Sequence, residues 1–402
     1  MYKFIDDIKE KDYDAFVKEY SMSSFMQEYN WGNVKEEWTP IHCGLYKDDS
    51  LVAVCTILKR RIIKNISIFY VPRGYLIDYE NIEVLKEMTK GIKGLAKKHH
   101  AYVVKIDPNY CTKEYGFKDN EIPINYSINN NIKNSNLKKC GYKFCGIKKD
   151  MRKSFQPQYD IFTPTININN EFLSDEELLK TYASRLRSYL NGYIPKRGIT
   201  YEYTTNERDL DDFVRLLKDT EKKQNINLRN RKYFEKIMSN YKGYCYLFFG
   251  TLDLNKYLEF LLNNNGSSEE IDMVKDTMSK EGNNLRISTA LVLLPKNEIG
   301  IRTSEYLYAG NSELFTNLKA SSGLVHEVIK FSRDNKCHYC NLGGVEGTLD
   351  DNLTRFKRQY NGVVMEFTGE YDLPTSILYY PIKLFYSPLL KLYRKILKKK
   401  SK

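Results

Sequence analysis

A lysine stands where a glycine-rich turn leads back into an apolar segment, and it is the first candidate for chemistry in this chain. The stretch GGVEGTLDDNLTRFKRQYNG places Phe356 and Lys357 between Arg355 and Arg358. A lysine within such a basic cluster is usually a solvated surface charge. The alternative is an ammonium group held beside a reacting carbonyl, where it would stabilise the negative charge that develops on the oxygen. The residue types alone leave both interpretations open.

Other polar residues stand at the ends of apolar segments, where α/β proteins form their binding sites. Arg73 interrupts the segment YVPRGY, and Asp107 closes AYVVKIDP. Asp107 could bind or deprotonate an amine, or it could only cap the turn before the following proline. Tyr306 and Tyr308 in YLYAGNS could orient a substrate through their hydroxyl groups, although most of the 33 tyrosines of a chain like this one pack in its interior.

Histidine and cysteine do not form a recognisable catalytic or metal-binding pattern. The five histidines are not accompanied by a Ser/His/Asp or Cys/His arrangement. Cys337 and Cys340 form a single CxxC without a second ligand pair, which we interpret as part of a buried strand. We therefore expect no metal, no cofactor and no covalent nucleophile.

Length and charge narrow the class of protein. A chain of 402 residues predicts two domains, and a net charge of +12 favours a polyanionic partner such as a nucleic acid, a phosphorylated metabolite or an anionic membrane face. The first residues are charged, and no apolar run approaches the ~20 residues of a membrane span. We expect a cytoplasmic protein with reduced cysteines.

The two halves of the chain repeat one order of elements. In the first half a β-hairpin is followed by a strand, an amphipathic helix and an apolar strand; the second half shows the same order. DYDAFVK at 12–18 is matched by DLDDFVR at 209–215. The expected fold class is therefore α/β (of the α+β type), built from two copies of one domain.

The expected boundaries follow from this repeat. We place the first domain at 1–150 plus 363–388 and the second at 151–362. Within the second, residues 252–282 predict a helical hairpin, which is either a surface excursion or a partner-binding arm. Residues 389–402 predict a basic amphipathic helix, suited to anionic lipid or else forming a solvated tail.

Five motifs, taken in order along the chain, resemble the FemABX family of enzymes that build peptidoglycan bridges. They are SFMQEYNWGNVKEEW, YVPRGYLIDYEN, YLYAGNS, LGGVEG and LTRFKRQYNGVVMEFTGEYDLP, between residues 24 and 374. The resemblance implies two tandem acetyltransferase-like (GNAT) domains with a helical arm in the second. The chain departs from the family at Tyr75, where proline is common, and in an inserted arm that is shorter than in several members.

The resemblance also implies an activity and its partners. Family members transfer an amino acid from aminoacyl-tRNA to the side-chain amine of the third residue of the peptidoglycan stem peptide. The acceptor is lipid II or the soluble UDP-MurNAc-pentapeptide. We expect a monomeric cytoplasmic aminoacyltransferase with peripheral contact to the anionic inner leaflet.

The family's Phe-Lys pair falls on Phe356 and Lys357, and it makes Lys357 the expected cation at the ester carbonyl. Asp107 is then the candidate for the incoming amine, and Arg73, Tyr306 and Tyr308 become candidate substrate contacts.

Two further roles are implied for the diphosphate of the acceptor. Lys35, between the only two tryptophans, is the first expected ligand; the alternative is a lysine paired with Glu36 or Glu37. The second ligand is expected in YASRLRSYLNGYIPKRGI, where Arg187 aligns best and Arg185 next.

Two other functions compete with this one. A GNAT N-acyltransferase that uses acyl-CoA would need a pyrophosphate-binding loop of the type Gln/Arg-x-x-Gly-x-Gly/Ala, which neither PRGYLID nor GGVEGTLDD provides. A non-catalytic RNA-binding or membrane-surface protein on the same scaffold would need none of the site residues.

Overall fold

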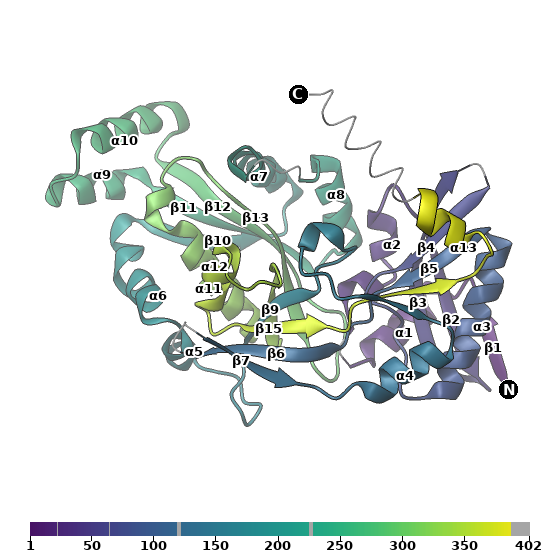
Figure 1. Ribbon diagram of the computed structural model, residues 1–402. Helices are drawn as coiled ribbons and strands as arrows, with labels where there is room; N and C mark the ends of the chain where they lie inside the picture. Colours follow the sequence, from purple (N-terminus) through teal and green to yellow (C-terminus); the bar gives the residue numbers. More distant parts are fainter. Residues whose placement is uncertain (22, 64, 119–121, 225–227, 387–402) are drawn as a thin grey trace.

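Two mixed sheets with their helices make up the protein (Figure 1). The structure is a computed structural model, and it describes residues 1–21, 23–63, 65–118, 122–224 and 228–386. The basic helix expected at 389–402 lies outside the described residues. No helix in the described part of the chain is long and apolar enough to cross a bilayer.

The first sheet has seven strands. Their order across the sheet is β1 (Tyr2–Ile5), β2 (Thr39–Lys47), β3 (Ser50–Ile63), β4 (Ile66–Val71), β5 (Ala101–Ile106), β16 (Glu370–Pro374) and β8 (Lys143–Gly146). Helix α3 (Ile82–Lys98) connects β4 to β5, which run parallel. The shorter helices of this half are α1 (Glu10–Lys18), α2 (Trp31–Val34) and α4 (Asn131–Lys139).

The second sheet has nine strands. Their order is β10 (Ile199–Thr204), β11 (Cys245–Asp253), β12 (Asn284–Leu293), β13 (Thr303–Asn311), β14 (Tyr339–Gly344), β9 (Tyr159–Pro164), β15 (Val363–Phe367), β6 (Cys111–Lys118) and β7 (Ile122–Ser127). Helix α11 (Ala320–Asp334) connects β13 to β14, which also run parallel.

The duplication expected from the sequence is present. In each sheet three antiparallel strands are followed by a helix and a fourth strand parallel to the third: β2, β3, β4, α3 and β5 in the first, and β11, β12, β13, α11 and β14 in the second. The α/β fold class and the expected duplication are therefore confirmed.

The sheets do not follow the domain boundaries expected from the sequence. Strands β6 and β7 come from the first 150 residues, yet they pair at the edge of the second sheet. Strand β15 lies beyond residue 362, and it pairs with β9 and β6 of that sheet, whereas β16 joins the first sheet. The chain thus exchanges strands between its halves, because hydrogen bonding of edge strands depends on spatial proximity and not on sequence position.

Side chains alternate across the second sheet and build a core on each face. Phe248 and Val292 pack with residues of α11, and Phe249 and Leu291 pack with residues of α7 (Leu210–Gln224). This alternation is what a sheet covered by helices on both faces requires.

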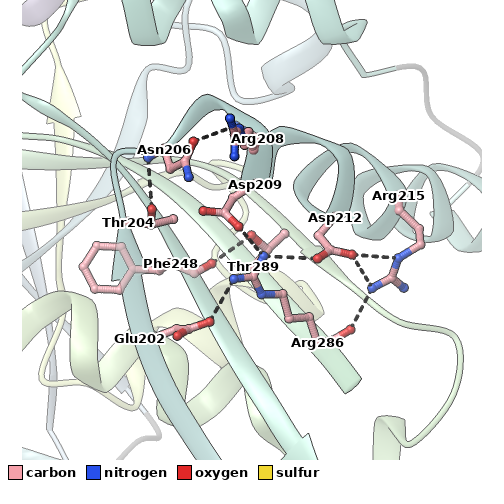
Figure 2. Close-up of polar contacts among 10 residues, drawn as sticks. All are labelled: Glu202, Thr204, Asn206, Arg208, Asp209, Asp212, Arg215, Phe248, Arg286 and Thr289. Atoms are coloured by element: carbon pink, nitrogen blue, oxygen red, sulfur yellow. Dashed lines mark hydrogen bonds and ion pairs between the residues drawn. The ribbon is translucent and has the colours of Figure 1, made fainter. Parts of the chain in front are cut away.

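A polar network holds the start of α7 against the sheet. Arg286 of β12 donates to Asp209 at 2.7 Å, to Asp212 at 3.1 Å and to Glu202 of β10 at 2.9 Å (Figure 2). Its guanidinium carbon also lies 4.0 Å from the ring centre of Phe249. One arginine therefore joins two strands to α7, which packs beside α8 (Arg231–Asn240).

The expected helical hairpin is formed by α9 (Leu254–Asn263) and α10 (Ser268–Glu281), which project at the end of the molecule away from the N-terminus (Figure 1). The remaining α-helices of the second half are α5 (Asp175–Thr181), α6 (Ser184–Ser188), α12 (Asn352–Arg358) and α13 (Tyr379–Pro381).

Candidate functional site

A cavity of about 880 Å³ is lined by both halves of the chain. Strands β9, β13, β14 and β15 of the second sheet contribute to its walls, together with the loop that follows β4 and the segment 20–35. Clefts between domains are frequent ligand sites, and a volume of this size accommodates a large polar ligand.

Lys35 lies in the wall of this cavity, within a group of aromatic residues. Its Nζ donates to Tyr233 Oη at 3.2 Å and lies 4.3 Å from the ring centre of Trp31. Tyr308 donates to the same Tyr233 oxygen at 3.1 Å. Burial lowers the pKa of Lys35 to about 8. The structure thus brings together Lys35 and Tyr308, two residues expected from the sequence.

Arg229 precedes α8 and lies beside Lys35. Its guanidinium carbon is 5.2 Å from the ring centre of Tyr233, and its charge is the second cause, after burial, of the lowered pKa of Lys35. Glu36 pairs with Lys236 at 2.9 Å, and in the described part of the chain neither Lys35 nor Arg229 forms an ion pair. We call Lys35 and Arg229 the cation pair; a bound anion would relieve their mutual repulsion.

Arg73 lies in the cavity wall, but its charge is already paired. Its Nη2 donates to Asp160 Oδ2 at 2.7 Å, its Nη1 donates to the Pro157 carbonyl at 3.2 Å, and its guanidinium carbon lies 4.1 Å from the ring centre of Phe367. A buried arginine with a buried partner mainly holds structure together, here by joining the loop after β4 to strand β9.

Asp107 does not reach the cavity. It is buried, and its two carboxylate oxygens accept from the backbone N–H of Arg73 at 2.8 Å and from Tyr70 Oη at 3.0 Å. Burial raises its pKa to about 7. Arg73 has a positive φ of 59°, which is strained for a residue with a side chain. The placement of Asp107 indicates that it fixes this turn, and its expected contact with the incoming amine stays a prediction.

Lys357 is buried, and it comes from a helix rather than from a strand end. Helix α12 begins after Asp351, whose carboxylate accepts from the backbone N–H groups of Leu353 and Thr354. The Lys357 Nζ donates to the Gly344 carbonyl at 2.9 Å. Burial lowers its pKa to about 8, and the charges of Asp160 and Asp351 oppose this shift. The interpretation of Lys357 as a solvated charge is therefore wrong.

Gly343 of β14 lies between the Lys357 ammonium group and Tyr306 of the neighbouring strand β13. Its φ is +81°, and a Cβ at this position would lie 3.6 Å from Lys357 Nζ. Gly343 and Gly344 both line the cavity. The positive φ is what favours glycine at 343, since a Cβ there would be in ordinary van der Waals contact with the ammonium group.

Tyr306 and Phe356 have different surroundings. Tyr306 lines the cavity, as expected for a substrate contact. Phe356 is half-buried on the second core, with its ring centre 5.8 Å from that of Tyr360, and it is not among the cavity-lining residues of the described chain. Its placement is that of a packing residue next to Lys357.

Arg185 and Arg187 are not brought to the cavity. Arg185 Nε donates to Tyr189 Oη at 2.7 Å, and Arg187 Nη1 donates to the Lys180 carbonyl at 2.9 Å. Their helix, α6, is anchored by the buried Leu186 in the second core, which leaves both guanidinium groups on the outer side. Neither residue lines the cavity, and the role of this segment as the second phosphate ligand stays a prediction.

A comparison with protein families decides the relationship of this chain. The model of the FemAB family matches residues 8–267 and 262–387. The chain belongs to the FemAB family. The resemblance noted in the sequence motifs is confirmed.

Curated relatives cover nearly the whole chain. The lipid II:glycine glycyltransferase of Staphylococcus aureus (strain bovine RF122 / ET3-1) is 26% identical over 91% of this chain and 91% of its own length. The protein of the same name from Staphylococcus haemolyticus is 24% identical, with the same coverage of both chains.

Solved structures agree on the FemAB fold. The crystal structure of FemX matches 97% of this chain and 99% of its own, with a TM-score of 0.75 and 22% identity. A tandem GNAT protein from the clavulanic acid biosynthesis pathway matches with a TM-score of 0.50, 6% identity, and coverage of 94% of this chain and 99% of its own.

Several polar residues in or near this FemAB cavity were not identified from the sequence. Arg229 lies beside the cavity-lining Lys35, and its own segment, NLRNRK, is one of many basic stretches in the chain. Asp160 and Glu305 are single acidic residues inside the apolar strands β9 and β13, and this isolation is the signal that could have revealed them. Asn341, next to the glycine pair in CNLGG, donates to both carboxylates.

Proposed function

We propose that this protein is an aminoacyltransferase that adds an amino acid to the stem-peptide side-chain amine of a peptidoglycan precursor, lipid II or UDP-MurNAc-pentapeptide, with aminoacyl-tRNA as the donor. The proposal draws on the relatives named lipid II:glycine glycyltransferase and on the family. The observation that carries it is one cavity with Lys35 in its wall and Arg229 beside that lysine, and with the buried Lys357 bonded to the backbone of the cavity-lining Gly344.

The cation pair suits the diphosphate of the acceptor. Both proposed precursors carry a diphosphate, and neither Lys35 nor Arg229 forms an ion pair in the described chain, although the charge of Glu37 acts on Lys35. Arginine binds phosphate through several N–H groups, and lysine acts as a point charge. Tyr233 and Tyr308 orient Lys35 through the hydroxyl chain described above.

Lys357 is proposed to stabilise the transition state. An amine that attacks an ester carbonyl produces a tetrahedral intermediate with a negative oxygen, and a preorganised cation at this oxygen lowers the barrier. The ester is already activated, so no covalent nucleophile is required. Lys357 is fixed by its bond to the Gly344 carbonyl and does not need to be reoriented during the reaction.

The projecting arm is an unfavourable surface for a tRNA backbone. Residues 254–281 contain six acidic residues and three lysines. Phosphate groups are bound by basic surfaces, so we place the donor elsewhere on the second domain. The segment 182–199 contains four basic residues and no acidic residue: Arg185, Arg187, Lys196 and Arg197. It contacts the C-terminal end of α12, where the Ala183 backbone N–H donates to the Gln359 carbonyl.

The decisive experiment incubates the protein with a panel of charged tRNAs and each precursor, and reads the product mass. A mass equal to the acceptor plus one amino-acid residue would establish the reaction and the amino acid together. Absence of product with every tRNA and both acceptors would contradict the proposal.

Two controls separate the competing functions. Stabilisation of the protein by coenzyme A in a thermal melt would favour an acyl-CoA-dependent enzyme. A non-catalytic RNA-binding or membrane-surface protein would bind tRNA or anionic vesicles without forming product.

We propose that the protein acts as a monomer in the cytoplasm, with peripheral contact to the inner membrane leaflet when the acceptor is lipid II.

A further inference from the structure

Two acidic side chains face the cavity from neighbouring strands, and the proposed phosphate and oxyanion contacts use neither. Asp160 lies on β9 and Glu305 on β13, with Asn341 on the strand β14 between them. The Asn341 amide nitrogen is 2.9 Å from Glu305 Oε2 and 3.4 Å from Asp160 Oδ2. We call Asp160 and Glu305 the carboxylate pair.

Asp160 has an unsatisfied oxygen. Its side chain is 3% exposed, and Oδ2 accepts from Arg73 at 2.7 Å. The other oxygen, Oδ1, is buried and has no hydrogen-bond partner within the described part of the chain. Leaving a buried polar atom unpaired is unfavourable by about 1–3 kcal/mol, and by more if the atom is charged. A hydrogen-bond donor from a bound molecule would therefore be stabilised at Oδ1.

Glu305 is half-buried because the cavity exposes part of its side chain. Burial raises its pKa well above the usual range, and the neighbouring charge of Asp160 raises it further. Arg73 and Asn341 oppose the shift, while the more distant Glu28 adds to it. Glu305 therefore holds a proton more readily than an exposed glutamate does.

The donor set of this site fits an ammonium group better than a metal ion. In the described chain no group of three or more His, Cys, Asp or Glu side chains is placed to hold a metal. Two carboxylates, one of them with an unused oxygen, match the three N–H donors of a primary ammonium group.

We propose that Asp160 and Glu305 form the subsite for the primary ammonium group of the acceptor, and that Glu305 removes its proton before attack. This inference rests on the proposed function and adds to it the residues that select and activate the nucleophile. The acceptor amine is favoured over the α-amino group of the donor because it must lose a proton to become a nucleophile, whereas the α-amino group takes no part in bond formation. Lys357, the proposed oxyanion cation, is close enough to Asp160 for the carboxylate charge to affect its pKa.

The proton balance of the step is complete without another reactant. One ammonium proton passes to the Glu305 carboxylate and leaves a neutral amine. The amine nitrogen attacks the ester carbon, an N–C bond forms, and the oxyanion is stabilised by Lys357. A second proton leaves the nitrogen and reaches the ribose oxygen as the C–O bond breaks. Glu305 then returns its proton to solvent, so that one proton is released per amide formed.

The first test compares Glu305→Gln with wild type and with Glu313→Gln, a control at an exposed glutamate beyond the end of β13. The amide keeps the size of the side chain and an oxygen that can accept from Asn341. We expect kcat of Glu305→Gln to fall by about 100-fold or more, as for loss of a general base, with kcat of the control unchanged. A kcat of Glu305→Gln within threefold of wild type would overturn the role in proton transfer.

The second test measures recognition of the amine by wild type, and so does not depend on how a variant folds. The probes are two water-soluble lipid II analogues, one with lysine and one with norleucine as the third stem residue. We expect wild type to bind the lysine analogue roughly tenfold or more tightly. Equal affinity of wild type for the two probes would overturn the subsite.

A third test determines whether the bound amine belongs to the acceptor or to the donor. The affinities of wild type and Glu305→Gln are compared for aminoacyl-tRNA and for its N-acetylated form. We expect the substitution to change the preference between the two acceptor probes and to leave the preference between the two donors unchanged. The reverse result would assign the carboxylate pair to the donor amine and overturn the proposal.

Failure of the subsite and failure of the proposed function give different results. If wild type forms no product with any charged tRNA, the proposed function fails. If wild type forms product but Glu305→Gln is as active and wild type does not distinguish the two acceptor probes, only the subsite fails.

Discussion

The ammonium nitrogen of Lys357 lies 2.9 Å from the carbonyl oxygen of Gly344, so that a charge carried by helix α12 is held against the end of strand β14. The lysine side chain is 7% exposed. Burial of a charge is unfavourable unless it is used or compensated, and this contact compensates it only in part. The geometry is that of a preorganised cation, and it leads to the first prediction.

Replacing Lys357 by alanine should lower kcat about 100- to 1,000-fold, because one preorganised donor to the oxyanion is lost. The affinity for the acceptor should stay within about threefold of wild type, since the cation pair is unchanged. Product formation and acceptor binding by calorimetry test both statements. Arg355→Ala on the exposed side of the same helix is the matched control. A variant K357A with normal kcat would remove Lys357 from the mechanism.

The pH dependence of kcat provides an independent test of Lys357. Because burial lowers its pKa to about 8, the side chain is charged below this pH and neutral above it. We expect kcat to fall as the pH rises through about 8, since the neutral amine stabilises an oxyanion poorly. Lys357→Arg keeps its charge to higher pH, so the fall should move upward in pH. The concentration of intact aminoacyl-tRNA must be measured at each pH, because its ester bond hydrolyses in alkali. An identical profile for both proteins would contradict the prediction.

Lys35→Ala and Arg229→Ala should each raise the KM for the acceptor about tenfold or more, because each removes a charged contact to the diphosphate. The effects of the two substitutions should not be additive, since both residues are proposed to bind one group. Lys242→Ala, an exposed lysine on the same domain, is the control. The double substitution Arg185→Ala/Arg187→Ala should leave the acceptor KM unchanged; an increase equal to that of Lys35→Ala would restore these residues as phosphate ligands.

Gly343→Ala should reduce both stability and activity. The positive φ of +81° is unfavourable for alanine by about 1–2 kcal/mol, and the new methyl group would lie 3.6 Å from the Lys357 ammonium. Denaturant unfolding and kcat measure the two effects. Gly192→Ala is the control, since this glycine has no positive φ and a Cβ there meets no atom within 4 Å. Equal stability of the two variants would contradict the strain.

Much of the fold could be predicted from the sequence because it depends on local periodicity. Alternating apolar residues indicate the strands, and the repeated order of hairpin, strand, helix and strand indicates the duplication. The helical arm followed from a polar turn between two helical segments. Predictions of this kind use neighbouring residues only, and they were confirmed.

The exchange of strands between the halves could not be predicted in the same way. Strands β6 and β15 are nearly 250 residues apart in sequence, yet Val364 pairs with Tyr115 in the second sheet. Either strand would have looked equally suitable for the first sheet, because the pattern of a strand does not specify its partner. For this reason the sheets do not follow the boundaries expected at 150 and 363.

The candidate site shows the same division. The sequence by itself singled out Lys35, Tyr306, Tyr308 and Lys357 through motifs that resemble those of the family, and their roles stay predictions. Only the tertiary structure decided that Arg73 is neutralised by Asp160, that Asp107 is turned away from the cavity, and that Glu305 faces it. The reason is physical: the role of a charged group depends on its burial and on the charges around it, and these are set by strands that meet only when the chain is folded.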